Sequence, residues 1–236
     1  MKIEFAGKVA LVAGGTGGLG RAVSLAFLEE GAKVVVVPYR NEREFAELRS
    51  AATGRETQLI GRVVDVLDEN AVTKLVKEVG RIDVMVNTVG GYAGGVELWK
   101  LEAATFDRML DLNLRTGFVL ARAVLPGMLK QGRGAIVNVC AKAAVDHAAG
   151  ASAYAASKAA SLALMDSLAA DTRGTGVRVN SILPSIIDTE ANRQAMPGAN
   201  YSVWPKPEEI ARVILFLCSD AAKVVHGAAV TVYGNS

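Results

Sequence analysis

A glycine-rich segment near the N-terminus is the feature that most restricts how this chain can fold. The apolar run Val9–Ala13 leads into Gly14-Gly-Thr-Gly-Gly-Leu-Gly20, and a helical pattern begins directly after it. Glycines let a backbone approach a pyrophosphate closely, and the free N–H groups of the following helix point at the anion. Strand, turn and helix in this order predict a dinucleotide-binding unit, and the alternative is a tight turn that binds nothing.

Strand-like and helix-like patterns alternate along the rest of the chain. We expect strands at about 8–13, 33–38, 59–64, 82–88, 134–140, 177–183 and 228–233, with helices between them. Continuous valine runs such as Val34–Val37 are typical of strands buried on both faces. The pattern predicts an α/β fold, a doubly wound parallel sheet (Rossmann fold) of about seven strands, as a single domain over residues 1–236. Ligands of such sheets bind beyond the carboxyl ends of the strands.

Composition limits the kinds of molecule that this protein can be expected to bind. The chain has 236 residues, 51% of them hydrophobic, and no linker-like or low-complexity stretch divides it. Its net charge of +2 is spread along the sequence, which favours a small-molecule substrate and no nucleic acid. We find no secretory signal and no apolar stretch of membrane-spanning length, so we expect a cytoplasmic protein with no membrane partner. Cys140 and Cys218 have no metal-ligand spacing, which predicts buried thiols and no metal.

Tyr154 and Lys158 lie four residues apart in a helical stretch and therefore share one face. A neighbouring ammonium favours the phenolate, so we expect Lys158 to lower the pKa of Tyr154 and to make it a general acid or base. The alternative is an ordinary helix with a packed aromatic ring and a solvated lysine.

These features together resemble the short-chain dehydrogenase/reductase family over essentially the whole chain. Ala13-Gly14-x-x-x-Gly18-x-Gly20 corresponds to the family's glycine motif, Asn87-Thr-Val-Gly90 to its Asn-Asn-Ala-Gly, and Tyr154-x-x-x-Lys158 to its catalytic pair. The resemblance implies that Tyr154, Lys158 and Asn113 are catalytic, and that Asn113 holds a water in a proton relay. It also implies that Lys158 and the following residues bind the cofactor: Gly14, Thr16, Gly18, Leu19, Gly20, Tyr39, Arg40, Asp65, Val66, Asn87, Val89, Pro184, Ile187 and Thr189.

One departure from the family is informative. The family has a serine thirteen residues before the tyrosine, which donates a hydrogen bond to the substrate oxygen, and this chain has Ala141 there. Loss of one such donor can cost carbonyl reduction roughly 10²–10³ in rate. Cys140 is adjacent, but alternation along a strand predicts that it points to the opposite side. The substrate therefore either needs no such donor, or catalysis is impaired.

Two groups within the family share further stretches with this chain. The segments 87–95, 141–146 and 183–204 resemble those of dihydropteridine reductases, which also lack the serine and whose quinonoid substrate is strongly electrophilic. By contrast, the stretches 108–117 and 132–138 resemble 3-oxoacyl-acyl-carrier-protein reductases. The substrate stays open between these two groups.

Cofactor choice depends on the end of the second strand. Pro38 stands where an acidic residue would bind the ribose 2′-hydroxyl of NAD, and Arg40 can pair with the 2′-phosphate of NADP. With no acidic residue recognised nearby, the sequence favours NADP and leaves NAD possible.

Past the sixth strand, a loop from Pro184 to Pro207 carries Trp204, a candidate for stacking on a substrate ring; subunit contact is its alternative role.

The sequence thus predicts an NADP-dependent short-chain reductase that transfers hydride to an electrophilic substrate such as a quinonoid dihydropterin or a quinone. The alternatives are a 3-oxoacyl-acyl-carrier-protein-type ketoreductase and a non-catalytic dinucleotide-binding protein. The helical stretches 101–130 and 152–173 combine Ala/Leu-rich faces with small residues, and the family resemblance implies that such helices pair between subunits in a homotetramer or homodimer.

Overall fold

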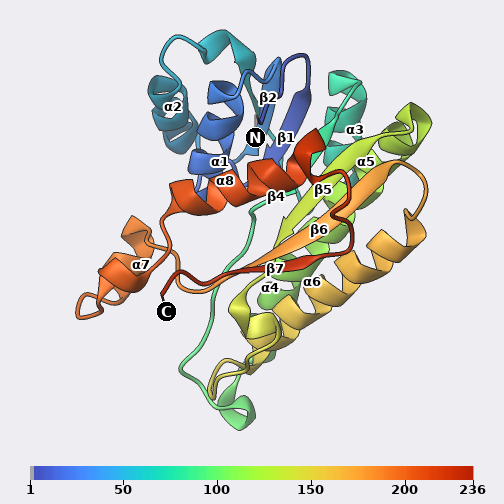
Figure 1. The fold of residues 1–236 in the computed structure, drawn as a ribbon. Helices are drawn as coiled ribbons and strands as arrows, with labels where there is room; N and C mark the ends of the chain where they lie inside the picture. Colours follow the sequence, from blue (N-terminus) through green and yellow to red (C-terminus); the bar gives the residue numbers. More distant parts are fainter. Residues whose placement is uncertain (1–2, 236) are drawn as a thin grey trace.

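The computed structural model describes residues 3–235 and contains one parallel sheet in the order β3-β2-β1-β4-β5-β6-β7 (Figure 1). Its strands are β1 Val9–Ala13, β2 Val34–Tyr39, β3 Leu59–Val63, β4 Val84–Asn87, β5 Gly134–Val139, β6 Val177–Pro184 and β7 Ala229–Val232. The predicted fold class is confirmed, and each strand end lies within two residues of its expected position.

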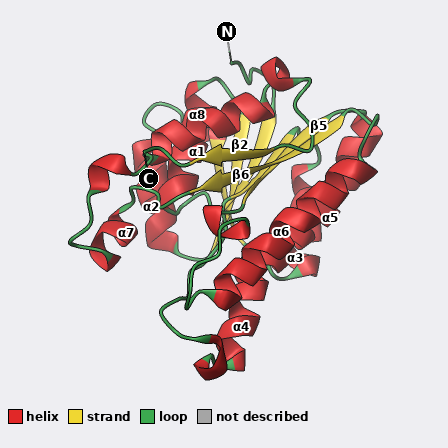
Figure 2. Ribbon diagram, turned by 60° about the horizontal axis from the view of Figure 1, so that its bottom comes forward, coloured by secondary structure: helices red, strands yellow, loops and turns green. Residues whose placement is uncertain are grey.

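Helices cover both faces of the sheet (Figures 1 and 2). They are α1 Gly18–Glu29, α2 Glu42–Ala51, α3 Glu69–Val79, α4 Ala103–Leu110, α5 Thr116–Gln131, α6 Ser152–Asp171, α7 Glu190–Ala195 and α8 Pro207–Cys218. One apolar cluster packs α1, α2 and α8 on one face, and a second packs α3, α5 and α6 on the other. Short helical turns lie at η1 Glu56–Gln58, η2 Leu98–Lys100, η3 Asp111–Arg115, η4 Lys142–Ala144, η5 Tyr201–Val203 and η6 Asp220–Ala222.

The valine run of β2 shows why this sheet forms. Val35 and Val37 belong to the cluster on one face, and Val36 belongs to the cluster on the other. Because successive side chains of a strand point to opposite faces, only a strand covered on both sides can bury such a run. β2 is fully paired, in parallel register with β1 and β3.

The order of the strands determines where a ligand can bind. β1 pairs with β2 on one side and with β4 on the other, so the chain reverses its direction of winding between β1 and β4. A crevice forms at the carboxyl ends of the strands at such a point. Within residues 3–235, no helix combines the length and apolar character needed to cross a bilayer.

Candidate active site

The turn between β1 and α1 is shaped for close backbone approach. Gly14 has a left-handed φ of 74°, and a Cβ on Gly20 would lie 2.0 Å from the Gly14 carbonyl oxygen. A Cβ on Gly18 would lie 2.8 Å from the Thr189 methyl carbon, so the loop after β6 packs directly on this turn. Gly18 and Gly20 are therefore required by contacts within the protein itself. The exposed start of α1 fits an anionic pyrophosphate group.

A cavity of about 320 Å³ adjoins this turn. It is lined by the sequence-predicted residues Gly14, Thr16, Tyr39, Arg40, Asp65, Val66 and Val89. Tyr39 stacks on Phe45 with ring centroids 4.5 Å apart, which gives the cavity a rigid aromatic wall. The shape and lining fit the adenosine half of a dinucleotide. Leu19 is buried in the core beneath the turn.

Charges in this cavity differ from the sequence-based expectation. The guanidinium of Arg40 lies 3.4 Å from Asp65 Oδ2, and both side chains are exposed. Thr16 Oγ1 donates to Glu44 Oε2 (2.9 Å), and Asn41 Nδ2 donates to Glu44 Oε1 (3.0 Å). The expectation that no acidic residue lies near Arg40 is therefore wrong: Asp65 pairs with it, and Glu44 lines the same cavity. Folding of α2 against the glycine turn, 28 residues away in sequence, places Glu44 there.

Lys158 is buried within α6, and its Nζ donates to the Val139 carbonyl oxygen (3.0 Å). A Cβ on Gly90 would lie 3.1 Å from this Nζ, so the glycine after β4 leaves room for the ammonium. Burial lowers the pKa of Lys158 to about 8, opposed by the nearby Cys140 thiol. The lysine is thus a buried charge without a carboxylate partner among the described residues.

Tyr154 is half-buried beside it. Burial, followed by the neighbouring Tyr92 and Cys140, raises the pKa of Tyr154 to about 12. The expected lowering by Lys158 is wrong for this structure, because burial, Tyr92 and Cys140 all raise the pKa of Tyr154 and the ammonium does not offset them. At neutral pH the phenol is protonated and is available as a proton donor.

Asn113 lies in a π-helical turn between α4 and α5. Its Oδ1 accepts from the Gly91 N–H (2.9 Å), and its Nδ2 donates to the Gly91 carbonyl oxygen (3.0 Å) and to Ser157 Oγ (2.9 Å). The side chain therefore ties the loop after β4 to α6, one residue before Lys158. Its proposed role in holding a water stays a prediction.

Asn87 anchors the end of β4. Its Nδ2 donates to Asn138 Oδ1 on β5 (2.9 Å), and its Oδ1 accepts from the Val89 N–H (3.1 Å). Asn87 is buried, and Val89 lines the cavity. Asn87 thus positions the cavity wall through Val89.

Ala141 and Cys140 follow β5, and both are buried. Asn138 Nδ2 donates to Cys140 Sγ (3.4 Å), and Cys140 shifts the pKa of both Tyr154 and Lys158. The expectation that Cys140 points away from Tyr154 and Lys158 is wrong, because its thiol lies on the same face of the strand as Asn138, and Asn138 Nδ2 also donates to Ser161 Oγ (3.0 Å) on α6, the helix that carries both residues. Burial also raises the pKa of Cys140 itself, so it remains a neutral thiol at physiological pH. Cys218 is likewise a buried thiol.

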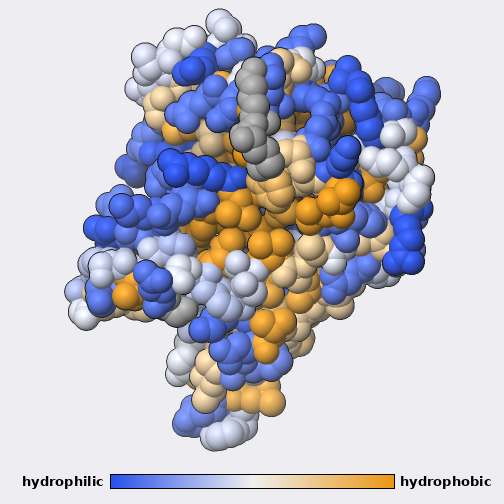
Figure 3. All heavy atoms as spheres, in the orientation of Figure 1, coloured by the Kyte–Doolittle hydropathy of each residue, from blue (hydrophilic) through white to orange (hydrophobic). Residues whose placement is uncertain are grey.

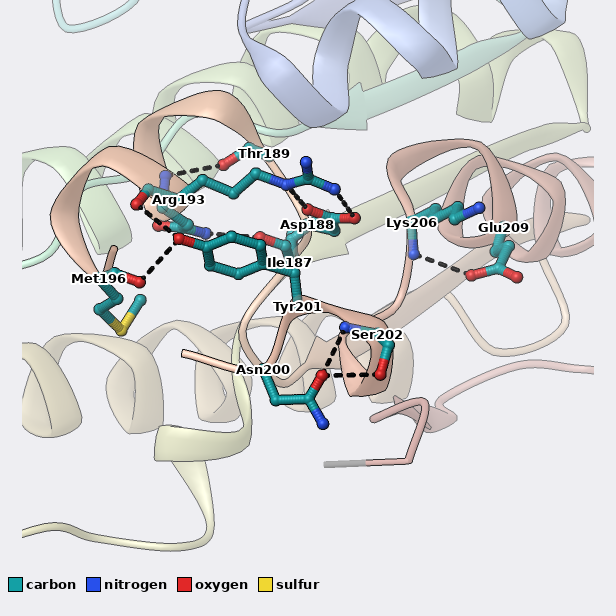
Figure 4. A network of polar contacts seen from close by, with 11 residues as sticks. Ile187, Asp188, Thr189, Arg193, Met196, Asn200, Tyr201, Ser202, Lys206 and Glu209 are labelled. Carbon is teal, nitrogen blue, oxygen red and sulfur yellow. Dashed lines mark hydrogen bonds and ion pairs between the residues drawn. The ribbon is translucent and has the colours of Figure 1, made fainter. Parts of the chain in front are cut away.

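The segment after β6 folds on itself (Figure 4). Arg193 Nη2 donates to Asp188 Oδ2 (2.8 Å), and its guanidinium lies 4.9 Å from the centre of the Tyr201 ring. Thr189 caps α7 by accepting from the Asn192 N–H (3.3 Å), while Asn192 Nδ2 donates to the Ile187 carbonyl oxygen (2.8 Å). Pro184, the last residue of β6, is buried at the start of the segment. The loop is therefore ordered by its own contacts.

Trp204 lies at the end of this segment and is only 7% exposed. Its ring packs on Tyr201 with centroids 5.0 Å apart. It therefore offers little free surface for a substrate to stack on, and the structure does not favour the substrate role suggested for it.

Two residues that the sequence analysis did not single out complete the site. One is Glu44, described above, and the other is Tyr92, whose ring packs on Tyr154 with centroids 5.0 Å apart and planes at 73°. The glycines on both sides of Tyr92 were a signal for it, since glycines allow a loop to approach other groups closely, and a Cβ on Gly90 or Gly94 would crowd Asn113 or the Tyr92 hydroxyl.

Comparison with known proteins agrees with this geometry. The family model described as short chain dehydrogenase matches residues 8–200. A 3-oxoacyl-[acyl-carrier-protein] reductase of Thermotoga maritima is 33% identical over 247 residues, covering 100% of this chain and 99% of the relative. A D-threitol dehydrogenase of Mycolicibacterium smegmatis is 35% identical over 243 residues, covering 97% and 92%.

Solved structures show the same fold. A putative NAD(P) dependent gluconate 5-dehydrogenase of Beutenbergia cavernae with bound NADP has a TM-score of 0.90 at 28% identity, covering 99% of this chain and 98% of that chain. A short-chain type dehydrogenase/reductase of Mycobacterium ulcerans has a TM-score of 0.92 at 25% identity, covering 98% and 90%.

Proposed function

The chain belongs to the short-chain dehydrogenase family, and on that premise we propose that it is an NADP-dependent reductase of electrophilic, conjugated substrates such as a quinonoid dihydropterin or a quinone. One observation carries the choice of substrate. A half-buried phenol with its pKa raised to about 12 stands beside a buried ammonium, and Ala141 provides no hydroxyl next to them.

These residues suit proton transfer to a substrate that accepts hydride readily. When bound, a reduced nicotinamide cofactor supplies the hydride. Tyr154 then gives its phenolic proton to the substrate atom that gains negative charge, and water returns a proton to the tyrosine. The positive charge of Lys158 stabilises the phenolate formed in this step. Hydride and proton together convert a quinone to a hydroquinone, so atoms and electrons balance.

The absence of a second donor favours substrates of this kind. In a simple ketone, charge develops on one oxygen, and an oriented hydroxyl stabilises that charge in the transition state. In a quinonoid ring, the charge spreads over the conjugated system and formation of an aromatic ring drives the reaction. The reaction then depends less on a donor at position 141.

NADP is the proposed cofactor because Arg40 lines the adenosine cavity and Pro38 offers no carboxylate for a ribose 2′-hydroxyl. A protein of the same fold at 28% identity, described as NAD(P) dependent, has a structure with NADP bound at low occupancy, which is consistent with this choice. The glycine turn would hold the pyrophosphate, and Lys158 the nicotinamide ribose.

A ketoreductase is the second candidate, favoured by the 33% identity to a 3-oxoacyl-[acyl-carrier-protein] reductase along the whole chain. A substrate panel followed at the nicotinamide absorbance separates the two. We expect a quinone and quinonoid dihydropterin to be reduced much faster than a simple ketone or a β-ketoacyl thioester, and Tyr154→Phe to remove most of this activity.

Ala141→Ser is the complementary variant, and we expect it to increase ketone reduction because it restores an oriented donor. Rapid turnover of β-ketoacyl thioesters by the unmodified protein would support the ketoreductase instead. Cofactor binding without turnover of any substrate would identify a non-catalytic dinucleotide-binding protein.

A further inference from the structure

Tyr92 forms an exposed aromatic wall beside the catalytic phenol. Its side chain is 67% exposed, although its ring packs on that of Tyr154 at 5.0 Å and 73°. Its hydroxyl has no hydrogen-bond partner among residues 3–235. A large aromatic ring is thus held against a half-buried catalytic residue while most of its surface faces solvent.

The position of this ring is fixed from both sides. Asn113 binds the N–H and the carbonyl oxygen of Gly91, the residue directly before Tyr92. A Cβ on Gly94 would lie 2.1 Å from the Tyr92 hydroxyl oxygen, so the ring lies over a glycine of its own loop. Because a buried helix residue holds one end and a glycine makes room at the other, the ring is preorganised before any substrate arrives.

From this geometry we infer that Tyr92 is a specificity-determining residue, the platform on which a planar conjugated substrate stacks so that its reacting edge meets Tyr154. This inference rests on the proposed function. Two rings at a steep angle form a corner, and a flat substrate lying on one of them presents its edge to the other.

The chemistry of the contact distinguishes a platform from a proton or hydrogen-bond donor. Stacking depends on the aromatic ring and is retained by Tyr92→Phe, whereas a donor role depends on the hydroxyl. Tyr92→Leu removes the aromatic face but keeps an apolar side chain that can still pack on Tyr154. The two variants therefore separate ring from hydroxyl without leaving a large gap in the loop.

The experiment measures KM and kcat for a naphthoquinone and for butane-2,3-dione, an electrophilic dicarbonyl with no ring. We expect Tyr92→Leu to raise KM for the naphthoquinone about tenfold, as loss of one aromatic contact implies, with kcat changed less than about twofold. KM for butane-2,3-dione should stay within about twofold of the unmodified protein, and Tyr92→Phe should behave like the unmodified protein with both. Trp99→Leu is the matched control, since Trp99 is 81% exposed further along the same segment and has no ring contact with Tyr154.

Equal increases in KM for both substrates, or a Tyr92→Phe variant as impaired as Tyr92→Leu, would overturn the inference. If no substrate turns over, the proposed function fails, and the platform is tested separately by titrating naphthoquinone onto the cofactor-loaded Tyr154→Phe protein with and without Tyr92→Leu. Unchanged affinity between these two proteins would overturn the platform even then.

Discussion

Arg40 and Glu44 carry opposite charges on the wall of one cavity. In the proposed cofactor site, Arg40 would attract the 2′-phosphate of NADP, while Glu44, fixed by Thr16 and Asn41, would repel it. The cavity thus contains Arg40, whose charge suits NADP, and Glu44, whose charge suits NAD. Glu44 reaches the cavity through the packing of α2 on the glycine turn.

We expect Glu44→Gln to strengthen NADPH binding about fivefold relative to NADH, since about 1 kcal/mol of repulsion is removed in a partly solvated cavity. Arg40→Ala should weaken NADPH binding selectively. Nicotinamide fluorescence titration of both cofactors measures these changes. Glu47→Gln is the control, because Glu47 lies on the same helix but pairs with Arg21 outside the cavity. Parallel changes in NADPH and NADH affinity would contradict this assignment.

The buried ammonium of Lys158 predicts how the free energy of unfolding changes with pH. Burial lowers its pKa from 10.5 to about 8, so the folded state binds fewer protons than the unfolded state between these values. The free energy of unfolding should therefore rise across this interval relative to a variant without the lysine. Below pH 8, Lys158→Met should be more stable than the unmodified protein by about 1–3 kcal/mol, because each pKa unit is about 1.4 kcal/mol. Loss of the hydrogen bond to Val139 offsets part of this gain.

Urea unfolding of both cofactor-free proteins from neutral pH to pH 10 tests this. Lys74→Met, at an exposed lysine, should show no such trend. A stability difference between the unmodified protein and Lys158→Met that does not change with pH would show that the buried ammonium carries no penalty.

In the loop after β4, Gly90 lies close to both η3 and α6. A Cβ on Gly90 would lie 2.9 Å from Asn113 Oδ1 and 3.1 Å from Lys158 Nζ, so the loop contacts η3 and α6 at the same point. Substitution there displaces the two catalytic candidates together, although neither is changed itself.

We expect Gly90→Ala to lower kcat at least about a hundredfold, because displacements of about 1 Å at a reacting centre have effects of this size. Circular dichroism should show an unchanged fold. The matched variant is Gly127→Ala in α5, where a Cβ meets nothing within 4 Å. It should stabilise the protein by about 0.5–1 kcal/mol and leave kcat unchanged. Full activity of Gly90→Ala would show that this contact does not hold the catalytic residues.

The surface of the whole molecule carries two apolar areas. A broad cleft between α4, α5 and α6 is lined by Leu110, Leu114, Phe118 and Leu164 together with the charged residues Asp107, Asp111 and Arg115, and Phe118 is 41% exposed. Figure 3 shows a second area between α8 and the edge strand β7. Apolar areas of this kind on a monomer mark contact surfaces, and two separate ones are what a tetramer requires.

We therefore expect a homo-oligomer, most simply a tetramer, by light scattering at micromolar concentration. Phe118→Asp should dissociate the α4–α5–α6 contact and reduce the mass at least twofold, because it buries a charge in an apolar interface. Leu129→Asp is the control, since Leu129 is 45% exposed at the far end of α5, away from the cleft. A monomer at all concentrations would contradict the prediction.

Local sequence determined the sheet and the elements of the site that depend on neighbours in the chain. The glycine turn, the valine strands and the Tyr154–Lys158 spacing are each written in residues that are near one another in the chain, so their patterns could be interpreted without coordinates. Only the tertiary structure decided the pKa values of Tyr154 and Lys158 and which side chains lie beside the site. Desolvation, which raises the pKa of Tyr154 and lowers that of Lys158, depends on everything packed around them. The placement of Glu44 beside Thr16, and of Tyr92 beside Tyr154, depends on contacts across 28 and 62 residues that no local pattern encodes.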